Sequence, residues 1–80
     1  MTVTVRLFAS YAESLGASEM ELDLHDGATI DDVIRSISKL PGAERLPPLP
    51  LVAVNRSYAS KGTAVRVGDE VALIPPVAGG

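Results

Sequence analysis

Apolar and polar residues alternate along two segments near the start of the chain. In residues 2–8, Val3, Val5 and Leu7 form one apolar set, and this period of two is typical of a strand with one buried face. Residues 18–25 alternate in the same way, with Met20, Leu22 and Leu24 as the apolar set. We therefore expect two half-buried strands, and Phe8 falls on the outward side of the first one.

Two helices are predicted around the second strand. Ser10 and Glu13 are spaced as a capping box for a helix of one or two turns, and Gly16 suits the left-handed end of that helix. Thr29 is expected to cap the main helix, and the Pro-Gly pair at 41–42 is expected to end it. The main helix carries one apolar stripe, which comprises Ile30, Val33, Ile34, Ile37 and Leu40.

The second half of the chain predicts three short strands. Residues 44–50 contain three prolines, which cannot donate backbone hydrogen bonds, so we expect an irregular connection there. Strands are predicted at residues 51–54, 58–60 and 70–74, with Val71 and Leu73 facing inward in the last. Both alternate sets of residues 51–54 are apolar, so the pattern does not assign an inward face to that strand.

This order of elements predicts an α+β fold in which one main helix covers a mixed sheet of four or five strands. Residues 1–76 are expected to form one domain, because a chain of 80 residues supports only one core, and residues 77–80 are expected to form a flexible tail. If the first and last strands lie side by side at the sheet centre, Phe8 and Ile74 both project from the face away from the helix.

Composition excludes most side-chain chemistry. The chain has no cysteine and one histidine, His25, which argues against disulfides, thiolate nucleophiles and a metal site. We expect His25 to be solvated. A net charge of -3 without a basic cluster argues against nucleic acid and anionic lipid as partners. No apolar run approaches the roughly 20 residues that a membrane span needs, so we expect a cytoplasmic protein.

Three segments carry a resemblance to a known family. They are Arg-Leu-Phe-Ala at 6–9, Ala-Val-Asn at 53–55, and residues 68–80, which begin Gly-Asp-Glu-Val and end Pro-Pro-Val-Ala-Gly-Gly. Together they resemble the small subunit of molybdopterin synthase, a ubiquitin-like sulfur carrier. The resemblance covers nearly the whole chain, its most specific part is the ending, and it implies a β-grasp fold.

The resemblance also implies that partner proteins perform the chemistry on the Gly80 carboxylate. An ATP-using enzyme of the ubiquitin-activating type would adenylate this group, and sulfur would then replace one oxygen to give a thiocarboxylate. The large catalytic subunit of the synthase, in a two-fold heterotetramer, would pass that sulfur to cyclic pyranopterin monophosphate. The chain itself would catalyse little and bind no cofactor. An ionised carboxylate, with a pKa of about 3.5, needs such activation because it is a poor electrophile.

Two groups of residues are expected to serve this function. Val77, Ala78 and Gly79 would thread the partner's active site, since glycine leaves room for a narrow channel. The residues predicted to contact the partner are Phe8, Tyr58, Ile74, Pro75 and Pro76. If the assignment of strand faces is shifted by one residue, Phe8 and Ile74 become ordinary side chains at the edge of the core. Tyr58 is equally consistent with an ordinary half-buried tyrosine.

Several alternatives stay open on the sequence alone. Arg6 and Arg56 fit either acidic groups of a partner or ordinary surface charge. The chain could carry sulfur for thiazole or cysteine synthesis, or act as a protein modifier whose Gly80 is joined to lysines. A non-covalent binding module, for which the Gly79-Gly80 ending would be incidental, is the fourth hypothesis.

Overall fold

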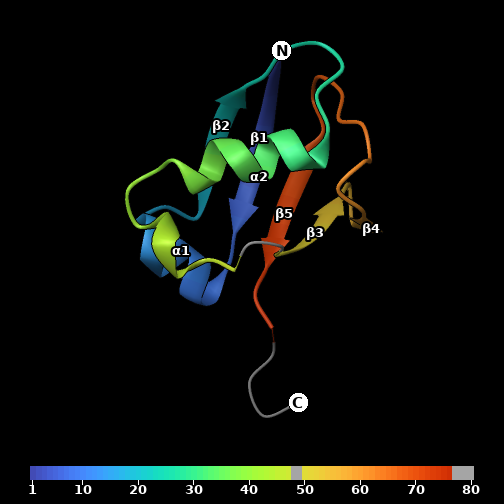
Figure 1. Cartoon of the computed structure of the whole chain (residues 1–80). Coiled ribbons are helices and arrows are strands. Elements are labelled where there is room, and N and C mark those ends of the chain that lie inside the picture. Colours follow the sequence, from blue (N-terminus) through green and yellow to red (C-terminus); the bar gives the residue numbers. More distant parts are fainter. Residues whose placement is uncertain (48–49, 77–80) are drawn as a thin grey trace.

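The computed structural model describes residues 1–47 and 50–76, which form one five-stranded sheet with a helix across one face (Figure 1). The strands lie in the order β2-β1-β5-β3-β4. Their bounds are Thr2–Leu7 for β1, Glu19–Asp23 for β2, Leu51–Val54 for β3, Ser57–Ala59 for β4 and Glu70–Ile74 for β5. The helices are α1, Ala9–Leu15, α2, Ile30–Ser38, and the short 3₁₀ helix η1, Ala43–Arg45.

The first and last strands lie side by side at the centre of the sheet, as the sequence predicted. β1 and β5 are parallel, and Val5 is paired with Val71, both fully buried. The other three pairings are antiparallel. Because the two central strands run in the same direction, Leu7 and Ile74 bring both strand ends to the same edge of the molecule (Figure 1).

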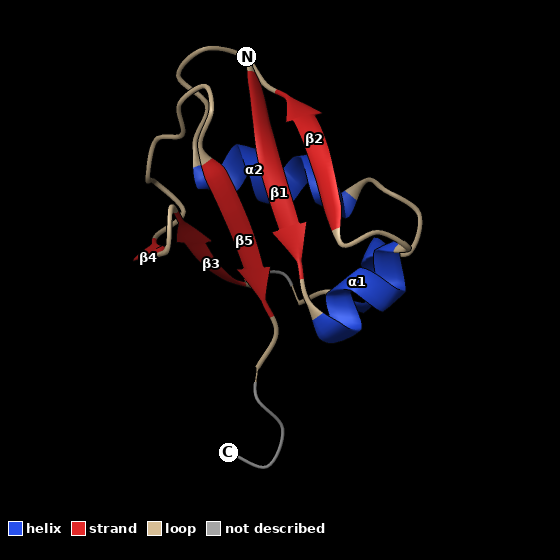
Figure 2. Ribbon diagram, turned by 180° about the vertical axis from the view of Figure 1, so that it is seen from behind, coloured by secondary structure: helices blue, strands red, loops and turns tan. Residues whose placement is uncertain are grey.

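The core lies between the sheet and α2. The alternation of β1 and β5 and the apolar stripe of α2 supply its largest fully buried side chains: Val3, Val5, Ile30, Val33, Ile37, Val71 and Leu73. Each such side chain stabilises the fold by about 1.5–3 kcal/mol relative to an exposed position. The opposite face of the sheet is left uncovered by α2 (Figure 2).

The cap predicted for α2 is confirmed. The carboxylate of Asp32 accepts hydrogen bonds from the backbone amide of Thr29 at 2.8 Å and from its hydroxyl at 3.2 Å, in a capping box. Asp31 and Asp32 both lie in the first turn, where the helix dipole favours negative charge. The helix ends at Ser38, so Leu40 packs against the core from the connection that follows.

The start predicted for α1 is wrong. The helix begins at Ala9, so Ser10 lies inside its first turn, and within the described residues no side chain caps it. Phe8 is the N-terminal flanking residue, and its carbonyl accepts hydrogen bonds from the amides of Tyr11 at 3.0 Å and Ala12 at 3.4 Å. The Phe8 carbonyl therefore closes the first turn of this helix, which places Ser10 inside the helix rather than before it. The left-handed end at Gly16, with φ of 75°, is as predicted.

Three other elements differ from or add to the sequence prediction. β2 is shorter than the 18–25 segment, and the proline-rich connection contains η1, which packs against α1 and α2. The inward face of β3 is also settled: Val52 is paired with Leu73 and Val54 with Val71, so both point toward α2. The pairing of β3 with β5 determines this orientation, which could not be predicted from the apolar run alone.

Tyr11 provides a test of the core. Its ring is 4% exposed, and its hydroxyl has no hydrogen-bond partner among residues 1–47 and 50–76, so burial raises the pKa of Tyr11. A buried hydroxyl without a partner costs about 1–3 kcal/mol. We expect Tyr11→Phe to raise the free energy of unfolding by roughly 1 kcal/mol in urea titrations. A loss of stability would show that the hydroxyl has a partner, such as a bound water.

Candidate functional site

A groove crosses the sheet face that α2 leaves uncovered. Its volume is ≈ 390 Å³. Residues from β1, β3, β4, β5 and the segments that join them line it: Arg6, Phe8, Ala53, Arg56, Tyr58, Glu70, Ala72 and Ile74. The groove extends across the outer face of both central strands, and Ile74 at the end of β5 forms part of its wall.

Small side chains create the hollow. Ala72 of β5 is paired with Ala53 of β3 on one side and with Arg6 of β1 on the other. Two alanines side by side leave room for an apolar side chain between the larger walls, which are Phe8 and Ile74 from one pair of strand ends and Tyr58 from β4. Figure 2 shows the strands that carry these residues from the open side.

The walls of the groove expose unusually large apolar groups. Phe8 is 44% exposed and Tyr58 is 75% exposed, and both are among the four large hydrophobic residues that the described structure leaves exposed. A cluster of exposed aromatic side chains around a hollow is typical of a protein-binding surface. The groove therefore suits a protein partner that presents an apolar side chain.

Charged groups occupy the rim. The guanidinium of Arg6 lies 3.5 Å from the carboxylate of Glu70 and 6.0 Å from the centre of the Phe8 ring. This arrangement holds Arg6 across β1 and β5, although both members of the ion pair are nearly half exposed and the pair adds little to stability. Arg56 has no carboxylate within 4.0 Å in the described part of the chain.

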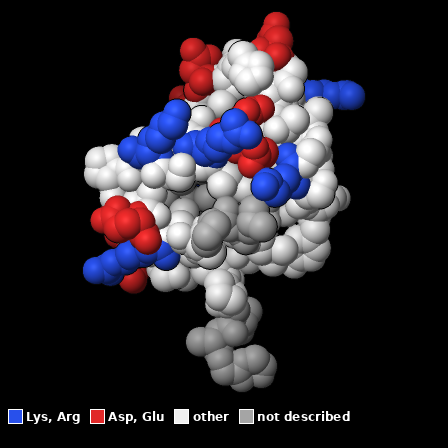
Figure 3. Space-filling view, viewed as in Figure 1, with Lys and Arg blue, Asp and Glu red and all other residues white. Residues whose placement is uncertain are grey.

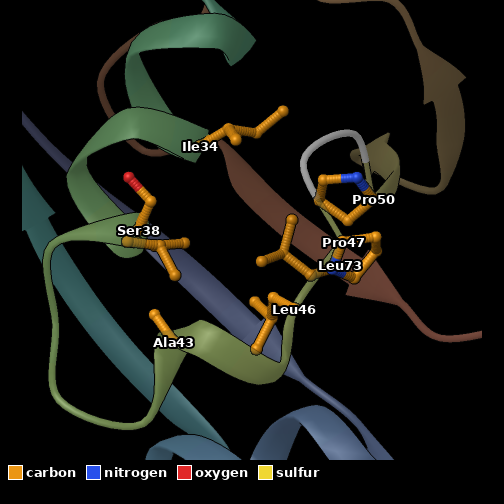
Figure 4. A pocket seen from close by; sticks show the side chains of 8 residues that line it. Ile34, Ser38, Ala43, Leu46, Pro47, Pro50 and Leu73 are labelled. Carbon is orange, nitrogen blue, oxygen red and sulfur yellow. The ribbon is translucent and has the colours of Figure 1, made fainter.

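A second cavity, of ≈ 130 Å³, lies between α2, η1 and β5 (Figure 4). Its lining is apolar apart from Ser38, whose hydroxyl donates to the backbone carbonyl of Arg35 at 2.7 Å. Ile34, Leu46 and Leu73 are among the side chains that point toward it (Figure 4). None of its described lining residues is an acid or a base, so this cavity offers no side chain for acid-base chemistry.

The single histidine lies near the start of α2. His25 is exposed, and its Nε2 lies 3.9 Å from the carboxylate of Asp32. The backbone hydrogen bond from Thr29 is the main cause that lowers the pKa of Asp32. The hydrogen bond from the Thr29 hydroxyl and the nearby positive charges of His25 and Arg35 also lower it. Within residues 1–47 and 50–76 no three metal-ligating side chains gather, and no helix is long and apolar enough to cross a bilayer.

Comparison with known proteins identifies the family. The sequence pattern of the ThiS family matches residues 5–80. The chain belongs to the ThiS family. One curated relative, the molybdopterin synthase sulfur carrier subunit of Chlamydomonas reinhardtii, is 34% identical over 83 aligned positions that cover all of both chains. The small archaeal modifier protein 1 of Haloferax volcanii is 33% identical, over 94% of this chain and 97% of that protein.

The fold agrees with this membership. The crystal structure of SAMP1 from Haloferax volcanii matches with a TM-score of 0.87 and 31% identity, and the match covers the whole of both chains. The β-grasp fold and the resemblance to the small subunit of molybdopterin synthase, both stated from the sequence, are therefore confirmed. ThiS-family relatives carry two kinds of name, sulfur carrier subunit and modifier, so membership alone does not choose between these functions.

The structure brings together some of the predicted site residues of this ThiS-family chain. Phe8, Tyr58 and Ile74 line one groove, whereas Pro75 and Pro76 follow β5 and are not among its lining residues. The tail residues Val77, Ala78, Gly79 and Gly80 lie outside the described residues. Sequence reasoning missed the two alanines of the floor, because only the strand register reveals that they are neighbours.

Proposed function

We propose that the chain is a sulfur carrier for molybdopterin synthesis and that its reactive group is the α-carboxylate of Gly80. The observation that carries this proposal is the ThiS-family membership together with full-length similarity to a named sulfur carrier subunit. The groove supports it, because Ile74 places one wall of a protein-binding surface shortly before the Gly79-Gly80 ending. The described side chains offer no competing nucleophile of the thiol kind, since the sequence has no cysteine.

The proposed reaction proceeds through two partner proteins. In an activating enzyme of the ubiquitin-activating type, the Gly80 carboxylate attacks the α-phosphorus of ATP and releases pyrophosphate, which leaves an acyl adenylate. A sulfur nucleophile then displaces AMP from the carbonyl carbon, so that one carboxylate oxygen departs with AMP and the chain ends in a thiocarboxylate. The thiocarboxylate is a soft, charged nucleophile whose sulfur would replace an oxygen substituent of cyclic pyranopterin monophosphate in the large subunit. Water would then cleave the bond between this sulfur and the Gly80 carbonyl carbon, which leaves the sulfur on the pterin and restores the Gly80 carboxylate.

The groove is the proposed docking surface for the large subunit. Docking would bury the exposed parts of Phe8 and Tyr58 and fix Ile74, from which the chain continues toward Gly80. Val77, Ala78 and Gly79 are proposed to enter the partner's active site, with Pro75 and Pro76 at its entrance. The two prolines restrict the backbone there, which would lower the entropy cost of ordering the tail.

Substitution of the groove walls tests the docking surface. We expect Phe8→Ala and Ile74→Ala each to weaken binding of the large subunit by about 1–3 kcal/mol in calorimetric titrations, because anchors of this kind dominate interfaces. Val67→Ala is the matched control, since Val67 is 73% exposed but lies outside the groove. Equal losses for all three variants, or none for the groove variants, would exclude this docking surface.

The second candidate function is protein modification, in which Gly80 forms an isopeptide bond with target lysines. The similarity to a named modifier at 33% identity favours it, and the same carboxylate and activating chemistry would serve it. Its signature is a ladder of conjugates in cell lysates that disappears when Gly80 is removed.

Reconstitution separates these functions. The thiocarboxylate form of the chain is mixed in one reaction with the large subunit of molybdopterin synthase and cyclic pyranopterin monophosphate. In parallel reactions it is mixed with the enzymes of thiazole and of cysteine synthesis. We expect sulfur transfer in the first reaction only. Transfer only in the thiazole or cysteine reaction would reassign the pathway, and conjugates without transfer would favour the modifier.

A further inference from the structure

The turn between β3 and β4 places an arginine where glycine is favoured. Only Asn55 and Arg56 separate the paired residues Val54 and Ser57, and their φ angles are 49° and 72°. Positive φ at both central positions is the signature of a type I′ turn, for which Asn-Gly is preferred. A non-glycine residue in this left-handed region costs roughly 1 kcal/mol.

Asn55 locks this turn in place. Its side-chain amide donates to the Asp69 carboxylate at 3.0 Å, and its side-chain oxygen accepts from the Glu70 amide at 3.0 Å. Its own backbone amide donates to the Glu70 carbonyl at 2.8 Å. Three hydrogen bonds therefore hold the hairpin tip against the start of β5, so that Arg56 cannot relax its backbone without breaking this attachment.

Arg56 also lacks the ion pair that Arg6, Arg35 and Lys61 have within the described residues. Arg6 lies beside Glu70, and Arg35 and Lys61 both lie beside Asp31. On the face that carries α2, positive and negative groups are intermixed (Figure 3). Arg56 is exposed at the groove and has no such carboxylate among the described residues. Two arginines and one glutamate give the groove a formal charge of +1 (2 − 1), on a chain whose net charge is -3.

We propose that Arg56 is the anion-recognition residue of the groove and that the docking protein places an Asp or Glu carboxylate against its guanidinium. An apolar side chain of the same partner would occupy the hollow above Ala53 and Ala72. Guanidinium binds carboxylate in a two-pronged geometry that fixes orientation as well as adding affinity. The inference rests on the proposed function, since it assigns a recognition contact to the proposed docking surface.

Arg56→Gly tests this assignment because it is expected to stabilise the isolated chain and to weaken its binding to the partner. Glycine suits φ of 72°, so the melting temperature of the isolated chain is expected to rise by roughly 2–5 °C. Binding of the purified large subunit of molybdopterin synthase is expected to weaken about tenfold, which corresponds to about 1.4 kcal/mol. The difference in affinity between wild type and Arg56→Gly should shrink as NaCl is added, because salt screens an exposed charge pair.

Two further variants complete the experiment. Arg56→Lys keeps the charge and is expected to bind more tightly than Arg56→Gly but less tightly than wild type, because lysine lacks the planar fork. Arg66→Ala removes an arginine outside the groove and is expected to leave affinity unchanged. If Arg56→Gly binds as tightly as wild type, or no more weakly than Arg66→Ala does, the assignment of Arg56 is wrong. Failure of the wild-type chain to bind would instead overturn the proposed function.

Discussion

Removal of Gly79 and Gly80 is expected to abolish sulfur transfer completely while leaving the fold intact. The proposed reaction needs a terminal carboxylate that reaches the active sites of the activating enzyme and the large subunit, and the shortened chain would end at Ala78. The sheet is complete at Ile74, so the melting temperature is expected to stay within about 1 °C of wild type. The measurement is molybdopterin formation in the reconstituted synthase.

Binding of the shortened chain supplies the control for this experiment. The groove residues are unchanged, so the shortened chain should still bind the large subunit, with lower affinity because the tail contacts are lost. Retained binding with no transfer is the expected combination. Full transfer by the shortened chain would contradict the assignment of Gly80 as the reactive group.

Gly42→Ala is expected to produce the largest loss of stability among single substitutions of the described glycines. Gly42 has φ of 91°, and a Cβ atom there would collide with the backbone carbonyl oxygen of Ser14 and lie 2.9 Å from its carbon. Neither backbone segment can move easily, since Gly42 leads into η1 and Ser14 belongs to α1. We expect a loss of roughly 3 kcal/mol or more in urea titrations.

Gly27→Ala is the matched control for this substitution. Gly27 has a similar φ of 84°, but a Cβ atom there would meet nothing within 4 Å among the described residues. The backbone conformation alone therefore costs roughly 1 kcal/mol at Gly27, and the collision accounts for the excess at Gly42. Equal losses at the two positions would mean that the contact between η1 and α1 adapts to the extra carbon.

Much of the fold could be predicted because local patterns and tertiary structure agree there. The alternation around Val5 and Val71 gave the buried faces of the two central strands correctly, and Thr29 with the stripe of α2 gave the position of the main helix. Each of these patterns depends on residues close together in the sequence. Ser10 is not the cap because the carbonyl of Phe8 already accepts from the amides of Tyr11 and Ala12, so the helix begins one residue before Ser10.

The groove could be predicted only in part, because its floor and its rim depend on pairings between distant residues. The outward placement of Phe8 and Ile74 followed from alternation, but Ala53 and Ala72 become a hollow only in the register of β3 with β5. The conformation of Arg56 was missed because the strand was predicted to begin at residue 58, whereas β4 begins at Ser57 and leaves a turn of only two residues. An asparagine before the arginine is the one local signal for that turn.

The central claim is that Gly80 carries sulfur as a thiocarboxylate, and intact-mass spectrometry tests it most directly. The full chain is incubated with the activating enzyme, ATP and a sulfur donor, and a parallel sample lacks ATP. We predict that the complete reaction raises the mass by the difference between one sulfur and one oxygen atom, and that fragmentation places the change at Gly80. An unchanged mass in the complete reaction, with the activating enzyme shown to be active on another carrier, would contradict the claim.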